Sequence, residues 1–258
     1  MNHERNLAEA FDRQAPQFER APIMTDPAAL GRLIQDADFP TGAYVLDAGC
    51  GPGIVSKGLL DAGFRVVGVD LSGQMIDRAR IRCADAGQRA RFLHASIYDA
   101  SLDAVAPFDG AISRYVLHHA ADPKEFLARQ VHLIKPGGVV AACDPVTDTD
   151  RARAAFHQAI ELERDQTHTR NMTSGELADW FASLGLEEIR LREEPFVLDF
   201  DEWFDRGTPG ESKENTRRHL LAGPPARGFH ATVQPSGRIS IACIRTLIRG
   251  VKPIRQSI

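Results

Sequence analysis

Short apolar runs alternate with amphipathic segments along the first half of the chain. Runs such as RVVGVD and GVVAACD are almost wholly apolar up to a final acid, as in strands that are covered by helices on both faces. Strands that alternate with helices in this way predict an α/β fold with a parallel sheet. Five strands are expected, at Ala43–Ala48, Arg65–Asp70, Arg91–Ala95, Phe108–Arg114 and Gly138–Asp144.

Helices with clear start signals connect these strands. One is expected from Ser72, a plausible N-cap, to Gly87, and another begins at Asp122 with Pro123 in its first turn. In the second half, Thr173 and Glu176 can form a capping box. The pattern there predicts helices over 147–166, 173–186 and 213–221 and strands over 187–200 and 238–251, with 199–235 otherwise rich in glycine and proline.

Composition limits the function classes. With 258 residues, 43% of them hydrophobic, the chain can form one large domain or one domain with a modest insertion. The net charge of −4 gives no basic field of the kind that nucleic-acid binding usually shows, so no nucleic acid is expected and a small-molecule partner is favoured. Four scattered cysteines without metal-ligand spacing predict no metal site and a reducing compartment. Without a secretory signal or a long apolar run, no membrane insertion and a cytoplasmic location are expected.

The stretch VLDAGCGPG, residues 45–53, is the strongest candidate for a ligand loop. A strand that enters a glycine turn and then a helix brings free backbone N–H groups to the carboxyl edge of the sheet. The dinucleotide fingerprint is incomplete, since Ile54 stands where the third glycine belongs, and Leu59 stands at the lysine position of a phosphate loop. Asp47, two residues before Gly49, would repel a pyrophosphate and would suit a cation.

A second acid follows on the next strand. Asp70 ends that strand 21 residues after Gly49 (70 − 49), a place where a carboxylate can accept hydrogen bonds from both hydroxyls of a ribose. The two acids therefore suggest a cation and a ribose as groups of the ligand.

Four ordered motifs together resemble one known family. VLDAGCGPG, VVGVDLSGQMIDRAR, FDGAISRYVLHHAADP and IKPGG are similar to class I S-adenosylmethionine-dependent methyltransferases, in particular the ubiquinone/menaquinone C-methyltransferase-like group, methyltransferase type 11. The match runs roughly from Phe11 to Pro145. It implies S-adenosylmethionine as the cofactor, with Asp47 facing its charged methionine part, Asp70 holding its ribose, and adenine contacts at Leu71 and Met75. The cofactor-binding residues that it implies are Asp47, Ala48, Gly49, Gly51, Gly53, Asp70, Leu71, Met75, Ser96, Ile97 and Arg114.

The sequence departs from the family at one position. Ser96 stands where an acid usually takes the adenine amino group, with Ile97 next to it to pack on the ring. A hydroxyl accepts a weaker hydrogen bond than a carboxylate does. Cofactor binding is expected to survive this change.

Candidate catalytic residues follow the fourth and fifth strands. His118 and His119 lie in the loop after one strand and Asp144 lies at the tip of the next, on the same edge of the sheet. A histidine beside a carboxylate is a general base that works near neutral pH, and the pair resembles the His/Asp pair of some sugar O-methyltransferases. The alternative is that one or both imidazoles shape the pocket or bind the cofactor.

The parts of the chain outside the core are expected to cover the site. The prediction is a single domain, with residues 1–40 as helices over the cofactor, 41–145 as the cofactor-binding core, 146–235 as a substrate lid with the sixth strand, and 236–258 as the final strand and tail. In the first part Phe18 replaces a tyrosine that is usual in the family. Candidate lid residues, for which ordinary packing is the alternative, are Phe156, His157, His168, Arg170, Trp203 and Phe204.

The fold predicted is therefore a doubly wound α/β sheet of seven strands, five of them parallel and the last antiparallel, with a helical lid. The expected function is methyl transfer to a small molecule, with oxygen, nitrogen and carbon acceptors all open. Two alternatives stay open: a methyltransferase that acts on RNA or protein, and a protein that binds S-adenosylmethionine without transferring a methyl group. The protein is expected to be a monomer or a homodimer.

Overall fold

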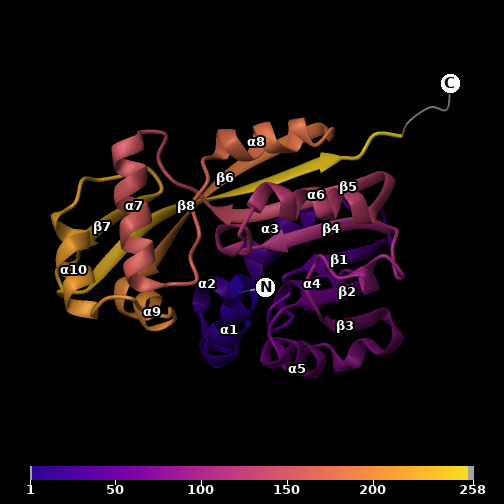
Figure 1. The fold of residues 1–258 in the computed structure, drawn as a ribbon, viewed down its shortest axis with the longest axis horizontal. Coiled ribbons are helices and arrows are strands. Elements are labelled where there is room, and N and C mark those ends of the chain that lie inside the picture. The colour runs from indigo at the N-terminus through magenta and orange to yellow at the C-terminus, as the bar shows by residue number, and fades with distance from the viewer. Residues whose placement is uncertain (1, 255–258) are drawn as a thin grey trace.

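The computed structural model describes residues 2–254, and its centre is a single mixed sheet (Figure 1). Within these residues eight strands pair in the order β3-β2-β1-β4-β5-β8-β6, and β7 pairs with β8. The first five are parallel, and β8 runs antiparallel to both β5 and β6. Their bounds are β1 Tyr44–Ala48, β2 Arg65–Asp70, β3 Ala90–His94, β4 Phe108–Arg114, β5 Ile134–Pro145, β6 Glu187–Asp199, β7 Phe229–Val233 and β8 Ile239–Val251.

The order of the parallel strands fixes where a ligand can enter. The chain moves from β1 outward to β2 and β3, then returns to β4 on the other side of β1. At this reversal the helices that follow β1 and β4 lie on opposite faces, which opens a crevice at the carboxyl ends of the two strands. The glycine loop and the histidine pair both lie at this edge.

Two helical layers cover the faces of the sheet. On one face α3 (Pro27–Ala37), α4 (Ile54–Asp61) and α5 (Gly73–Arg82) contribute to a common core, and on the other face α6 (Pro123–Leu133) and α8 (Ser174–Ser183) do so. β1 through β5 with these five helices are called the parallel half below. Its doubly wound architecture confirms the predicted fold class.

The predicted helix starts are confirmed by their caps. The side chains of Ser72, Asp122 and Thr173 accept hydrogen bonds from backbone N–H groups three residues later, at 3.1, 3.0 and 3.1 Å. The predicted end of the first helix is wrong. α5 stops at Arg82, and a 3-10 turn follows over Ala84–Arg89 in which Gly87 has a φ of 56°.

A second, smaller core lies beyond the parallel half. β6 and β8 project past the end of β5, and α7 (Arg151–Arg164), α9 (Phe200–Asp205), α10 (Lys213–Ala222) and β7 gather around the projecting ends (Figure 1). This distal unit has its own apolar cluster. The buried members are Ile160, Leu198, Phe200, Trp203, Phe204, Leu220, Ala226, Phe229, Ile239, Ile241 and Cys243.

The distal unit differs in two ways from the prediction. The segment 199–235 was expected to hold one short helix, but it forms α9, α10 and β7, so the described sheet has one strand more than predicted. Moreover α8, expected among the lid helices, buries Leu177 and Phe181 against the sheet, and only α7 of that pair stands in the distal unit. Of the predicted tail, residues 255–258 lie outside the described part of the chain.

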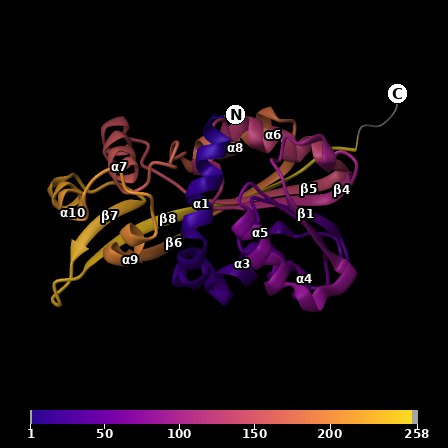
Figure 2. The same ribbon diagram turned by 60° about the horizontal axis from the view of Figure 1, so that its bottom comes forward.

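The N-terminal helix α1 (Asn2–Arg20) lies between the two regions, as Figures 1 and 2 both show. Asp12 accepts hydrogen bonds from the Ser72 hydroxyl at 2.5 Å and from the Gln74 N–H at 3.1 Å, which ties α1 to the start of α5. On its other side Gln14 donates to the Thr208 hydroxyl of the distal unit at 2.7 Å. The α1 helix therefore bridges the carboxyl edge of the sheet. Among residues 2–254, no helix combines the length and apolar character that a bilayer crossing requires.

Candidate active site

The glycine loop after β1 has the conformation that its sequence demands. Gly49, Gly51 and Gly53 have φ values of 71°, 51° and 77°, in the left-handed region that residues with a Cβ disfavour. A Cβ on Gly49 would lie 2.6 Å from the side chain of Val116, and one on Gly53 would lie 2.9 Å from the Cα of Ala79. The loop is thus pressed against both the turn that follows β4 and α5, and its open side faces the crevice.

Asp70 braces this loop from the neighbouring strand. Its carboxylate accepts hydrogen bonds from the N–H of Gly51 at 2.8 Å and from the N–H of Ser72 at 2.9 Å. Burial raises the pKa of Asp70, and these two hydrogen bonds counteract the rise. The acid therefore joins the glycine turn to the start of α5 and still lines the crevice.

A cavity of about 450 Å³ occupies the crevice. Its lining combines apolar side chains with the loop backbone and a few carboxylates, which suits a ligand with a flat apolar ring, hydroxyls and a positive charge. The predicted residues that line it are Gly49, Gly51, Asp70, Leu71, Met75, Ser96, Ile97, Arg114 and His119. The predicted residues outside its lining are Asp47, Ala48, Gly53, His118 and Asp144.

Asp47 lies beneath the loop and not on the cavity surface. It is 1% exposed and accepts a hydrogen bond from the Ser56 hydroxyl at 2.6 Å. Burial, together with the charge of nearby Asp70, raises its pKa to about 7 although Ser56 opposes the rise. A cation above the loop would favour its ionised form.

The acid that is missing at position 96 has a neighbour in space. The Ser96 hydroxyl donates to the carboxylate of Glu4 at 2.6 Å, and both residues line the cavity. Glu4 belongs to α1, as do Leu7 and Phe11 in the same wall, whereas the resemblance began only at Phe11. Sequence reasoning missed Glu4 because the contact joins residues 92 positions apart and follows no local pattern.

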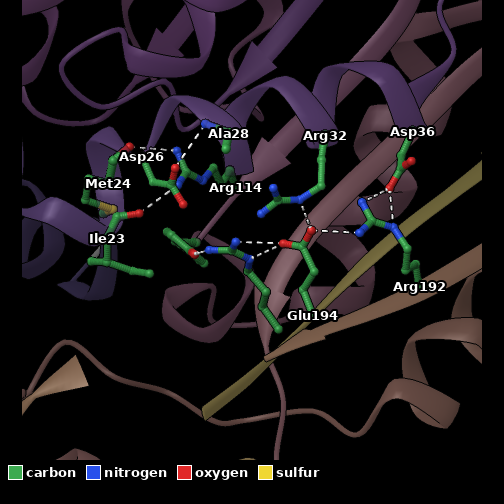
Figure 3. Close-up of polar contacts among 11 residues, drawn as sticks. Ile23, Met24, Asp26, Ala28, Arg32, Asp36, Arg114, Arg192 and Glu194 are labelled. Atoms are coloured by element: carbon green, nitrogen blue, oxygen red, sulfur yellow. Dashed lines mark hydrogen bonds and ion pairs between the residues drawn. The ribbon is translucent and has the colours of Figure 1, made fainter. Parts of the chain in front are cut away.

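Arg114 lines the cavity, but its guanidinium is already engaged. It donates to the carbonyl oxygens of Met24 and Ile23, both at 2.9 Å, and so fastens α2 (Pro22–Thr25) to the tip of β4 (Figure 3). Met24 in turn forms part of the cavity wall. Arg114 therefore positions the N-terminal segment at the edge of the site.

The buried carboxylate of Glu194 holds α3, which follows α2 in the chain. Glu194 of β6 accepts hydrogen bonds from Arg32 of α3, from Arg192 at 2.7 Å and from Arg245 of β8 at 2.9 and 2.7 Å (Figure 3). Burial alone would raise the pKa of Glu194, but these three guanidinium groups lower it to about 2. Arg245 also donates to the hydroxyl of Tyr115 at 2.8 Å, which links the network to the site.

A second cavity of about 70 Å³ adjoins the first. Apart from the residues that it shares with the first cavity, its lining comes from the distal unit and from the ends of β4 and β5, and includes His118, Arg164, Trp203 and Arg206. The two cavities have four lining residues in common, namely Phe18, Met24, Tyr115 and His119. The two cavities are therefore neighbours, separated by these four side chains.

His118 and Asp144 do meet, as the sequence predicts. Nδ1 of His118 lies 2.5 Å from Oδ1 of Asp144, a carboxylate that is 1% exposed. Asp144 also accepts from the N–H groups of Val116 and Leu117 at 3.0 Å each, so it shapes the turn that carries the histidines. Burial disfavours the imidazolium of His118, yet the charge and hydrogen bond of Asp144 outweigh burial and raise the pKa of His118.

His119 occupies a different setting. It is buried, its Nδ1 lies 3.1 Å from the carbonyl oxygen of Thr167, and the ring of Phe11 meets it edge-on at 5.0 Å. Burial, with the neighbouring His118 and His168, lowers the pKa of His119 well below its ordinary value. His119 is therefore a neutral wall residue between the cavities.

The predicted lid residues separate into two groups. His157 and Trp203 line the second cavity, whereas Phe156, His168, Arg170 and Phe204 do not line either cavity.

Tyr115, which sequence reasoning did not single out, has a φ of 59° and stands in the shared wall. A left-handed backbone is costly for a tyrosine and is typical of functional sites.

Comparisons with known proteins agree with this geometry. A family model described as a methyltransferase domain matches residues 10–191. Among curated proteins, a ubiquinone biosynthesis O-methyltransferase of Xylella fastidiosa (strain 9a5c) is 33% identical over 168 residues, which cover 60% of this chain and 67% of that protein. A ubiquinone biosynthesis O-methyltransferase of Xanthomonas axonopodis pv. citri (strain 306) is 28% identical over 157 residues, or 57% of this chain and 64% of that protein.

Solved structures confirm the fold. The YcgJ protein from Bacillus subtilis has a TM-score of 0.76 at 23% identity, covering 88% of this chain and 99% of its own. A phosphoethanolamine N-methyltransferase 2 of Haemonchus contortus, solved with phosphomonomethylethanolamine and S-adenosylhomocysteine, has a TM-score of 0.58 at 18% identity, covering 88% and 53%. The chain therefore belongs to the methyltransferase domain family and is a class I S-adenosylmethionine-dependent methyltransferase.

Proposed function

We propose that the protein transfers a methyl group to a hydroxyl of a small acceptor that binds in the second cavity, with His118 as the general base. The observation that carries the proposal is the pairing of His118 with buried Asp144 at the edge of that cavity, which shares a wall with the larger one. The aromatic lining, with Trp203 and Phe229, favours an acceptor that contains a ring. The names of the curated relatives, O-methyltransferases, agree with an oxygen acceptor.

The hydrogen bond to Asp144 decides which nitrogen of His118 can act. If Nδ1 carries the proton that it donates to Oδ1, Nε2 keeps a free lone pair, and that lone pair can take the proton of an acceptor hydroxyl. The bound cofactor supplies the electrophilic methyl group. The protein orients the two reactants, which can contribute about 7–11 kcal/mol, and removes the hydroxyl proton.

The base predicts a pH profile. Because Asp144 raises the pKa of His118 above 6.5, the free base is lost as the pH falls through that raised value. kcat is therefore expected to decline on the acid side with an apparent pKa above 6.5. A profile that stays flat from pH 5 to 9 would contradict a base at this position.

The direct test replaces His118 by glutamine and measures release of S-adenosylhomocysteine against a panel of phenols, amines and carbon acids. kcat for phenols is expected to fall about 10²–10⁴-fold while S-adenosylhomocysteine binds as before. His132→Gln is the matched control because that imidazole is 69% exposed. Unchanged phenol turnover in His118→Gln would exclude the base, and methylation confined to amines or carbon acids would exclude the hydroxyl acceptor.

We also propose how the cofactor is held. Asp70 receives the ribose hydroxyls, Leu71 and Met75 flank the adenine ring, and the backbone of Gly49 and Gly51 allows close approach, in keeping with the lining of the larger cavity. Glu4 takes the place of the acid that is absent at position 96, and its carboxylate accepts a hydrogen bond from the adenine amino group. Its hydrogen bond with Ser96 and its place in the wall support this role.

A further inference from the structure

One arginine of the second cavity is buried without hydrogen-bond partners. Arg206 follows α9, is 6% exposed, and lines the cavity. Its Nε and Nη1 atoms make no hydrogen bond to any part of the described chain. Since a buried charged donor that lacks an acceptor is costly, such a group in a native protein calls for an explanation.

The other contacts of Arg206 leave its hydrogen-bonding capacity unused. Nη1 lies 3.2 Å from a carboxylate oxygen of Glu202, a side chain that is 36% exposed, without hydrogen-bond geometry. The guanidinium also stands 5.9 Å from the ring centroid of Phe18, in the wall shared by the two cavities. Burial and the charge of Arg164 lower the pKa of Arg206 to about 10, so it is still a cation at neutral pH.

The remaining charged groups of this cavity are already matched. Arg164 donates to the carbonyl oxygen of Trp203 at 2.9 Å and to the carboxylate of Asp165 at 3.0 Å. Glu161 lies 3.5 Å from Nε2 of His157. Arg206 is thus the charged group of the lining whose hydrogen-bonding needs the described chain does not meet, and it needs an acceptor from outside the chain.

We propose that the methyl acceptor carries an anionic oxygen group, a carboxylate or a phosphate ester, which binds to Arg206 in the second cavity. A planar guanidinium offers two parallel N–H donors that match either group. Glu161 stands in the same lining and its negative charge also acts on Arg206, so a bound anion competes with this carboxylate for the guanidinium. The inference rests on the proposed function only in calling this ligand the acceptor, because anion binding can be measured without turnover.

The test is calorimetry of the full chain, saturated with S-adenosylhomocysteine, with benzoate, benzamide and phenyl phosphate. Benzamide has nearly the shape of benzoate but no charge, so the wild type is expected to bind benzoate at least tenfold more tightly. Arg206→Gln is expected to lose that preference. Arg238→Gln is the control, since its side chain is 70% exposed in the same distal unit. Tighter binding of phenyl phosphate than of benzoate would identify the group as a phosphate ester.

Two results would overturn the anion site: equal binding of benzoate and benzamide by the wild type, or an unchanged preference in Arg206→Gln. S-adenosylhomocysteine affinity reports whether each variant is folded. If Arg206→Gln fails that check, Arg206→Lys keeps the charge without the planar fork and is expected to show a reduced preference. Loss of the preference in Arg206→Gln alongside unchanged phenol turnover in His118→Gln would reject the proposed base and leave the anion site in place.

Discussion

The parallel half and the distal unit hold their ligand-facing groups in different ways. In the parallel half, Asp70 and Asp144 accept backbone N–H groups, so the acids are part of the turns that they stabilise. In the distal unit, Arg206 projects from the end of a short helix and lacks such partners. The backbone therefore fixes the positions of Asp70 and Asp144, whereas the hydrogen-bond donors of Arg206 stay available for a ligand. This division suits a common cofactor on one side and a specific acceptor on the other.

The same contrast holds for the two apolar cores. Phe108, the first residue of β4, is fully buried and contacts Tyr44, while Phe200 is 1% exposed within the cluster of the distal unit. Neither ring lines either cavity. The two phenylalanines are therefore matched probes of the two regions.

The largest effect is expected from truncating these rings. Phe108→Ala and Phe200→Ala should each lower the free energy of unfolding by about 3–5 kcal/mol, because each leaves a cavity in a packed core. At 25 °C Phe108→Ala is expected to weaken S-adenosylhomocysteine binding, whereas Phe200→Ala should spare it and reduce turnover. Thermal unfolding and calorimetry check both outcomes. Equal loss of cofactor affinity in the two variants would show that the regions do not act separately.

Much of the parallel half was predictable because its signals are local. Strands buried on both faces are apolar, the starts of α5, α6 and α8 carry a side-chain cap, and Gly49, Gly51 and Gly53 adopt backbone angles that other residues disfavour. The pairing of His118 with Asp144 also follows from topology, since the tips of adjacent parallel strands meet at one edge.

The rest depends on contacts that have no sequence pattern. β7 was missed because its short run FHATV is largely exposed and lies in a segment rich in glycine and proline. Arg114 lines the larger cavity as a predicted cofactor residue would, but its hydrogen bonds to the carbonyl oxygens of Ile23 and Met24, about ninety positions away, follow no sequence pattern. The burial of Arg206 without a hydrogen-bond partner depends on tertiary contacts at the end of α9, such as the approach of its guanidinium to Phe18 of α1, and no spacing in the sequence encodes them.

Buried carboxylates give the next test, because their pKa values move in opposite directions in the two regions. Burial raises the pKa of Asp47 to about 7. In the distal unit burial would also raise the pKa of Glu161, but the hydrogen bond from His157 and the charge of Arg164 outweigh it and lower that pKa to about 2. Ionised Asp47 should therefore destabilise the folded state, and ionised Glu161 should stabilise it.

The sign follows from proton uptake. Between about pH 4 and 7 folded Asp47 keeps a proton that the unfolded chain releases, so a rising pH favours unfolding by about 1.4 kcal/mol per unit. Asp47→Asn should remove this pH-dependent fall in the free energy of unfolding, so the cofactor-free variant should be more stable than the wild type above pH 7. Glu161→Gln should remove stability that is present above pH 4.5 and lost as the pH falls toward 2. Urea unfolding from pH 4 to 8 measures both, and shifts of equal sign would refute the contrast.

A smaller effect is expected from the glycine loop. Gly53→Ala places a Cβ 2.9 Å from the Cα of Ala79 at a φ of 77°. It should lower the free energy of unfolding by about 2–3 kcal/mol and also weaken cofactor binding. Gly63 has a φ of 91° but open space around it, so Gly63→Ala should cost only about 1 kcal/mol and leave affinity unchanged. Urea unfolding and S-adenosylhomocysteine titration compare the two. Similar losses in both variants would mean that backbone strain, and not the fit of the loop on α5, limits this site.

The smallest effect is expected from Glu4, the acid that α1 places in the wall of the larger cavity. Glu4→Ala should weaken S-adenosylhomocysteine binding about tenfold, the scale of one hydrogen bond to a charged group, while Glu9→Ala on the exposed face of α1 should leave it unchanged. Adding Ser96→Asp to Glu4→Ala should restore affinity, because it returns a carboxylate to the tip of β3. Titration calorimetry measures all three variants. If the added acid restores nothing, Glu4 acts by anchoring α1 and not by meeting the adenine.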